Sequence, residues 1–72
     1  MGEEPMTATQ FRTALAHLDL SQVGAARLFH VSEKTARNWA RKGVKGTVVV
    51  LLRLLLAGKI TIKDVEKAWK TS

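Results

Sequence analysis

The chain has 72 residues, which is enough for one small domain and too few for a two-domain enzyme. Its 12 Lys and Arg residues outnumber its 6 Asp and Glu residues, giving a net charge of +6, and 46% of its residues are hydrophobic. This hydrophobic content predicts a packed core rather than a disordered chain. The absence of cysteine excludes a disulfide scaffold, a thiolate metal site and a nucleophilic thiol.

The positive charge is concentrated in one stretch. Residues 27–45 contain six basic residues and one acidic residue, a net charge of +5, whereas residues 1–26 contain one basic and three acidic residues. A compact basic segment in a small domain indicates a polyanionic partner, which is more often a nucleic acid than an acidic membrane surface.

The sequence predicts neither a secretory signal nor a membrane anchor. The acidic N-terminus lacks the apolar stretch of a secretory signal, and the apolar run at residues 48–57 contains Arg53. That run is also much shorter than the roughly 20 residues that cross a bilayer. We therefore expect a buried helix there, and a cytoplasmic, nucleoid-associated protein.

Capping residues define the first two predicted helices. Thr7 and Gln10 match a capping box, and apolar residues at helical spacing predict a helix over about residues 8–18. Ser21 is expected to cap a short second helix that ends near His30.

The next two helices also have start and stop signals. Ser32 is expected to cap a helix at Glu33–Lys42, which Gly43 ends. Thr47 is expected to cap an apolar helix that ends at Gly58.

A fifth helix completes the prediction. Thr61 and Asp64 match a second capping box, from which a helix extends to about Lys70. No stretch alternates between apolar and polar residues as a half-buried strand does. We therefore expect an all-α, compact five-helix domain at residues 7–72, preceded by a flexible tail at residues 1–6.

The segment Gln22–Arg41 has the pattern of two short helices joined by a tight turn. Ala26 is small enough for the two helices to pack closely, and Val31 is placed to fill the turn. The side chains expected to face the core are Phe29, Ala36 and Trp39. The side chains expected to point outward from the second helix are Glu33, Lys34, Arg37, Asn38 and Arg41.

This segment resembles the helix-turn-helix of the lambda-repressor-like (Cro/C1-type) DNA-binding domains, and the five predicted helices fit that family over about residues 7–70. Gln22 matches a family glutamine that touches a phosphate, while Ala26 and Val31 match the small and apolar positions of the motif. His30 departs from the pattern, because the family usually has a glycine there in a left-handed turn.

The resemblance implies that the helix at Glu33–Lys42 enters the major groove of DNA, with its N-terminal residues at the base edges. The implied base-reading residues are Ser32, Glu33, Lys34, Arg37 and Asn38. Their chemistry suits the role, because Arg and Lys can donate to guanine, Asn can pair with adenine, and Glu can accept from cytosine. The implied phosphate contacts are Gln22, Arg41, Lys42 and Lys45.

Simpler roles remain open for several of these residues. Ser32 also fits a helix cap, Glu33 a favourable charge in the first helical turn, and Asn38 an ordinary surface position. The basic residues could form a plain solvated face, although that face lacks the acids that such helices use for i,i+4 pairs. Trp39 fits core packing better than a stacking platform for single strands.

The sequence contains no recognisable catalytic or ligand-binding constellation. His17 and His30 are isolated, so a zinc site is not expected. Paired carboxylates, a glycine-rich phosphate loop and a catalytic triad are not apparent. We therefore expect a protein that is not an enzyme and that has no cofactor, metal or small-molecule ligand.

The helix at residues 48–57 is apolar nearly all round and must be buried on more than one side. Either the other helices cover it within one chain, or a second copy does. Candidates for a homodimer interface formed by this helix and the C-terminal helix are Val49, Val50, Leu52, Arg53, Leu56 and Trp69. A two-fold dimer would read an inverted repeat in double-stranded DNA.

These features predict a small transcriptional regulator of bacterial or phage type, acting as a repressor by occupying its operator. Autoregulation, an antitoxin role and control of phage genes remain open. The alternative is a small helical protein-interaction or RNA-binding module that uses its basic helix on an acidic partner.

Overall fold

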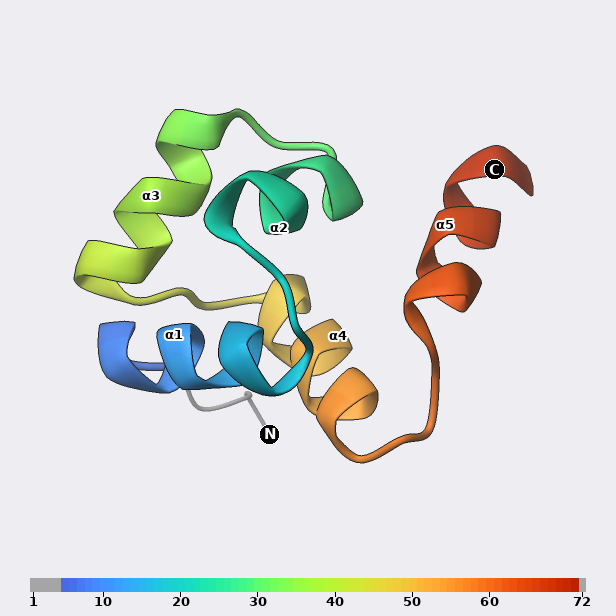
Figure 1. Cartoon of the computed structure of the whole chain (residues 1–72), viewed down its shortest axis with the longest axis horizontal. Coiled ribbons are helices and arrows are strands. Elements are labelled where there is room, and N and C mark those ends of the chain that lie inside the picture. The colour runs from blue at the N-terminus through green and yellow to red at the C-terminus, as the bar shows by residue number, and fades with distance from the viewer. Residues whose placement is uncertain (1–4, 72) are drawn as a thin grey trace.

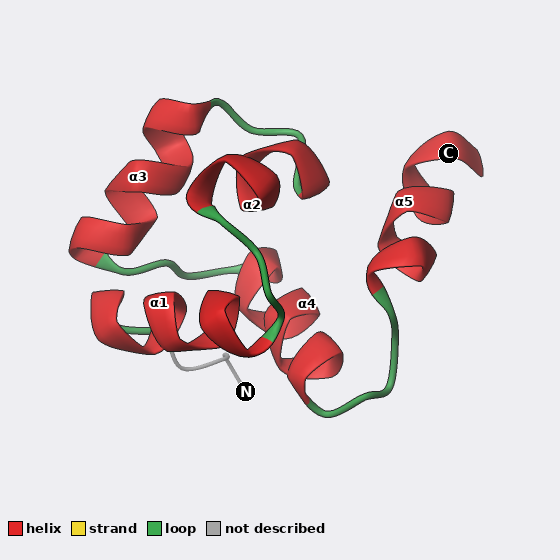
Figure 2. Cartoon of the chain, viewed as in Figure 1, coloured by secondary structure: helices red, strands yellow, loops and turns green. Residues whose placement is uncertain are grey.

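The computed structural model describes residues 5–71, and every regular element in that range is a helix (Figures 1 and 2). The helices are α1 (Ala8–His17), α2 (Gln22–Leu28), α3 (Glu33–Lys42), α4 (Thr47–Leu56) and α5 (Ile62–Thr71). β pairing in the same range is limited to one isolated antiparallel bridge between Met6 and Val44. The predicted all-α class and the five helices are confirmed.

Helix α2 lies between α3 and α5. It packs against both of them, while α1 packs against α3 and α4. In Figure 1, α3 and α5 stand at opposite sides of the molecule, and α5 stands apart from α1 and α3. Helix α2 is therefore the element that links α3 to α5.

Four of the predicted N-terminal caps are confirmed. The Thr7 hydroxyl accepts from the Gln10 backbone N–H at 3.1 Å, and the Gln10 side chain accepts from the Thr7 N–H at 2.9 Å. The hydroxyls of Ser21 and Ser32 accept from backbone N–H groups three residues later, at 2.9 and 3.1 Å. Thr61 begins α5 with a second reciprocal pair. Each bond satisfies a backbone donor that has no partner within its helix.

The two predicted ends of α4 were wrong. Gly46, not Thr47, occupies the N-cap position, and no described side chain caps this helix. Gly46 has a φ of 90°, which a residue with a Cβ adopts only with strain, so Thr47 becomes the first helical residue. The helix ends at Leu56 because Gly58 is already left-handed, with a φ of 75°.

Four helices are followed by a residue with a positive φ. These residues are Asp19 after α1, His30 after α2, Gly43 after α3 and Gly58 after α4. At the end of α2, the Val31 N–H donates to the Ala26 carbonyl at 3.0 Å, which is the longer hydrogen bond of a Schellman motif. His30, with a φ of 56°, thus has the conformation that usually requires glycine. Because His30 is left-handed, α2 cannot continue through it, and Leu28 is the last helical residue.

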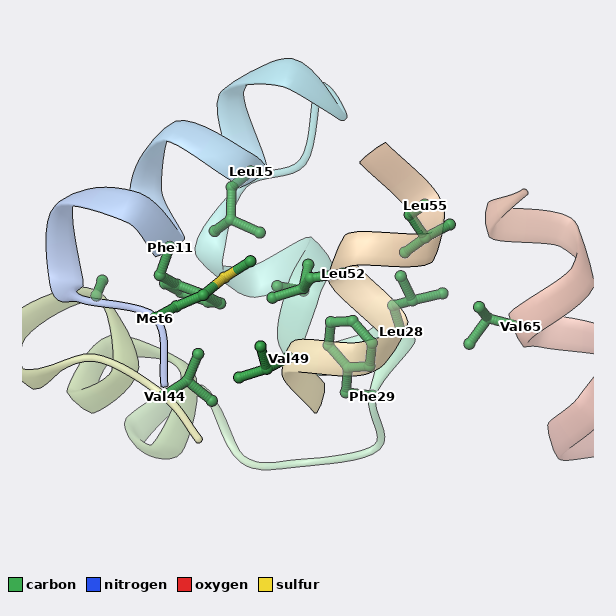
Figure 3. Close-up of a cluster of buried hydrophobic side chains, with 12 residues drawn as sticks. Met6, Phe11, Leu15, Leu28, Phe29, Val44, Val49, Leu52, Leu55 and Val65 are labelled. Carbon is green, nitrogen blue, oxygen red and sulfur yellow. The ribbon is translucent and has the colours of Figure 1, made fainter. Parts of the chain in front are cut away.

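The core lies among the first four helices, and Val65 extends it to α5 (Figure 3). Phe11, Val49 and Leu52 are fully buried, and Phe29 is 5% exposed. No polar or charged residue among those described is buried. Apolar packing therefore holds the helices together.

Met6 belongs to this core, which corrects its prediction as part of a flexible tail. It is 7% exposed, and it exchanges two backbone hydrogen bonds with Val44, at 2.8 and 3.0 Å. Residues 1–4 of the predicted tail lie outside the described residues. Gly43 makes the bridge possible, because a Cβ at this position would lie 2.5 Å from the Met6 carbonyl oxygen. The segment before α1 is thereby fixed to the C-terminal end of α3.

Candidate nucleic-acid interface

Helix α3 turns one face to the core and the opposite face to solvent. Ala36 and Ala40 are 0% and 3% exposed. Trp39 is half-buried, with its ring edge-on to Phe11 at 5.9 Å and to Phe29 at 6.4 Å between centroids. These contacts confirm the predicted core positions and fix the rotation of α3 about its axis.

The predicted base-reading residues lie on the other face and at the start of the helix. Glu33, Lys34 and Arg37 are exposed, as is Ser32 at the N-cap. Asn38 is half-buried, so less of its amide is available to a ligand. The structure thus brings together an exposed surface of four polar or charged side chains, with Asn38 at its edge.

Two of these residues already have hydrogen-bond partners. The Ser32 hydroxyl accepts from the Thr35 N–H and lies 3.0 Å from the Thr35 hydroxyl, which supports the simpler capping role. Glu33 accepts from Arg37 Nη2 at 3.4 Å, an i,i+4 ion pair that corrects the expectation that this face lacks acids for such pairs. Both members of that pair are more than half exposed, so it contributes only a few tenths of a kcal/mol and could open for a ligand.

The predicted phosphate-contacting residues occupy two places. Arg41 and Lys42 lie on the last turn of α3, and Lys45 follows shortly after it. Gln22 is the first residue of α2. All four are exposed and could meet phosphate oxygens. Arg27 on α2 is also exposed and adds a positive charge that was not predicted as a contact.

Trp69, which was predicted as a residue of a dimer interface, contacts the α2–α3 turn of its own chain and remains 42% exposed. Its indole Nε1–H donates to the Leu28 carbonyl at 2.7 Å, and its ring stacks on His30.

Two of the six dimer candidates were wrong. Val49 and Leu52 are 0% exposed, because they pack within their own chain and cannot reach a second copy. Val50 is half-buried, while Arg53 and Leu56 are exposed. Helices α4 and α5 border an open groove of about 470 Å³, which Val50, Arg53 and Leu56 do not line. Its lining is mostly apolar and comprises Leu51, Leu54, Ile60, Asp64, Val65, Ala68 and Trp69.

None of the described helices combines the length and hydrophobicity needed to span a bilayer. Among residues 5–71, no three His, Asp or Glu side chains lie together in a group that could hold a metal ion. Comparison with known proteins found no matching family model, no matching curated protein and no matching solved structure.

Proposed function

We propose that this chain is a sequence-specific double-stranded DNA-binding regulator of transcription with a lambda-repressor-like helix-turn-helix formed by α2 and α3. The placement of α3 supports this most strongly. Ala36 and Ala40 hold one face against the core, and Lys34 and Arg37 extend from the exposed face. Arg and Lys donors suit O6 and N7 of guanine, and an α-helix fits the major groove.

The flanking cations would set affinity and register. Arg41, Lys42 and Lys45 lie at the end of α3, and Gln22 at the start of α2 could donate to a further phosphate. Contacts of this kind carry no sequence information but make binding dependent on salt, since they release counterions from the DNA.

Repression by operator occupancy is the regulatory mechanism we propose, in a bacterial or phage setting. A protein bound across a promoter excludes polymerase without any further surface. Activation would need a second patch that contacts polymerase.

We further propose that two copies bind an inverted repeat through the groove between α4 and α5. The second copy would cover the apolar lining of this groove, which includes Leu51 and Leu54 of α4. Sedimentation on a duplex with half-sites about 34 Å apart should give two protomers per duplex. Leu54→Glu should reduce the stoichiometry to one protomer per duplex. A stoichiometry of one protomer per duplex for the wild type would contradict the dimer.

Selection from random duplexes at moderate salt tests the function. The wild type should enrich one sequence, and Arg37→Ala should lose preference at one position of it. Lys63→Ala is the matched control, because it removes one exposed positive charge from α5 rather than from α3. It should enrich the same sequence as the wild type.

The alternative is a helical module that binds RNA or an acidic protein. Equal retention of single-stranded RNA and duplex DNA would favour it and contradict our proposal, as would failure to enrich any duplex. The position of Trp39 between Phe11 and Phe29 makes it a poor platform for stacking single-stranded bases.

A further inference from the structure

The last turns of α5 reach back to the α2–α3 turn through Trp69. The Trp69 Nε1–H donates to the Leu28 carbonyl at 2.7 Å, across 41 residues of sequence. Its ring lies almost parallel to that of His30, with centroids 4.1 Å apart and planes inclined by 11°. One side chain therefore contacts both the last residue of α2 and the left-handed residue that follows.

Each contact offsets an unfavourable feature of the turn. One feature is a carbonyl that has no partner within its helix, and the other is a strained backbone conformation. Leu28 is the last residue of α2, so its carbonyl lies among those that have no partner within the helix. His30 has a φ of 56°, which strains a residue with a Cβ. Trp69 supplies the donor for the carbonyl and a flat surface that holds the imidazole in place.

The α2–α3 turn also determines the position of α3. Leu28 and His30 flank Phe29, whose ring contacts Trp39 of α3. Val31 completes the turn by donating to Ala26. A change in this turn would therefore change how α3 sits against α2.

Helix α5 itself is held by few buried groups. Among residues 62–70, Val65 alone is buried, and Trp69 is 42% exposed. Trp69 also lines two open grooves, of about 470 and 460 Å³. Elements with so little buried area open more readily than the core.

We propose that Trp69 is a positioning residue for α3, and that docking of α5 keeps the α2–α3 turn in the conformation that presents α3. The part of this inference that concerns DNA rests on the proposed function. The part that concerns the turn does not.

Amide hydrogen exchange of the full chain tests, without DNA, the part of the inference that concerns the turn. Trp69→Ala should speed exchange of the Val31 amide about tenfold, because the turn opens more often. The matched control is Leu56→Ala, which removes an equally exposed side chain, also 42%, from α4. It should leave Val31 unchanged. Trp69→Phe, which keeps a ring but loses the donor, should give an intermediate rate.

A rescue separates positioning from general destabilisation. Glycine adopts the left-handed conformation without strain, so His30→Gly should make the turn less dependent on Trp69. The double variant His30→Gly/Trp69→Ala should therefore exchange more slowly at Val31 than Trp69→Ala. If Trp69→Ala does not fold, the comparison of Trp69→Phe with the wild type decides. Val31 exchange that is the same in the wild type and in the folded Trp69 variants would overturn the proposal.

Duplex binding tests the part of the inference that concerns DNA. Trp69→Ala should lower the ratio of affinities for the selected and a scrambled duplex by roughly fivefold or more, while Leu56→Ala should preserve it. An unchanged ratio would overturn the effect on DNA. Failure of the wild type to bind any duplex would contradict the proposed function and leave the exchange result to decide the role of Trp69.

Discussion

The imidazole of His30 lies flat against the indole of Trp69, with ring centroids 4.1 Å apart. His30 is also left-handed, with a φ of 56°. Strain and stacking therefore act on the same residue in opposite directions, and two substitutions at position 30 isolate the strain.

His30→Ala should destabilise the protein more than His30→Gly. Both remove the stack on Trp69, but alanine keeps the left-handed strain and glycine relieves it. The free energy of unfolding should be lower in the alanine variant by about 1 kcal/mol. Urea denaturation of the two variants measures this difference. Equal stabilities would mean that the backbone at position 30 is not strained.

Gly43→Ala should be among the most destabilising single changes in this chain. The added Cβ would lie 2.5 Å from the Met6 carbonyl oxygen, and Gly43 also has a φ of 97°. We expect a loss of about 3 kcal/mol or more. Gly58→Ala is the control, because Gly58 is left-handed but has open space at its Cβ position, so it should cost about 1 kcal/mol. Equal melting temperatures of the two variants would contradict the close contact with Met6.

Ala26→Leu should overpack the crossing of α2 and α3. Ala26 is 2% exposed, so three additional carbon atoms have no free space. The free energy of unfolding should fall by about 1–3 kcal/mol, which thermal denaturation can measure. Val23→Leu is a suitable control on the same helix, because Val23 is 40% exposed. An Ala26→Leu variant as stable as this control would refute the tight crossing.

Asp64 should make α5 sensitive to acid. The backbone N–H of Thr61, and next its hydroxyl, hold the pKa of this exposed carboxyl below its ordinary value. The folded state therefore favours the charged form, so the stabilisation is complete above the unfolded pKa and is lost as pH falls through the folded pKa. The stability difference between the wild type and Asp64→Asn should shrink between about pH 7 and about pH 3. A difference that stays constant over this range would contradict the role of Asp64.

Much of the fold could be predicted because its signals are local. The caps at Thr7, Ser21, Ser32 and Thr61 depend on side chains that bond within three residues, so the sequence alone identifies them. The start of α4 was missed because both Gly46 and Thr47 suit an N-cap, and the backbone angle of Gly46 decided between them.

Contacts between distant segments could not be predicted in the same way. Met6 pairs with Val44, and Trp69 with Leu28, across separations that no local pattern encodes. The exposed face of α3 was predicted correctly, since Ala36 and Trp39 mark the buried side by their spacing. The pairing of Glu33 with Arg37 was overlooked, although its i,i+4 spacing is a local signal.

Equilibrium binding of Arg37→Ala and Lys42→Ala to the selected duplex and to a scrambled duplex tests most directly whether α3 reads DNA. Arg37→Ala should cost about 1–3 kcal/mol on the selected duplex and relax preference at one base pair. Lys42→Ala should weaken binding to both duplexes alike and reduce the salt dependence by about one unit. Identical effects of the two variants on both duplexes, or no preference of the wild type for either duplex, would contradict sequence reading by α3.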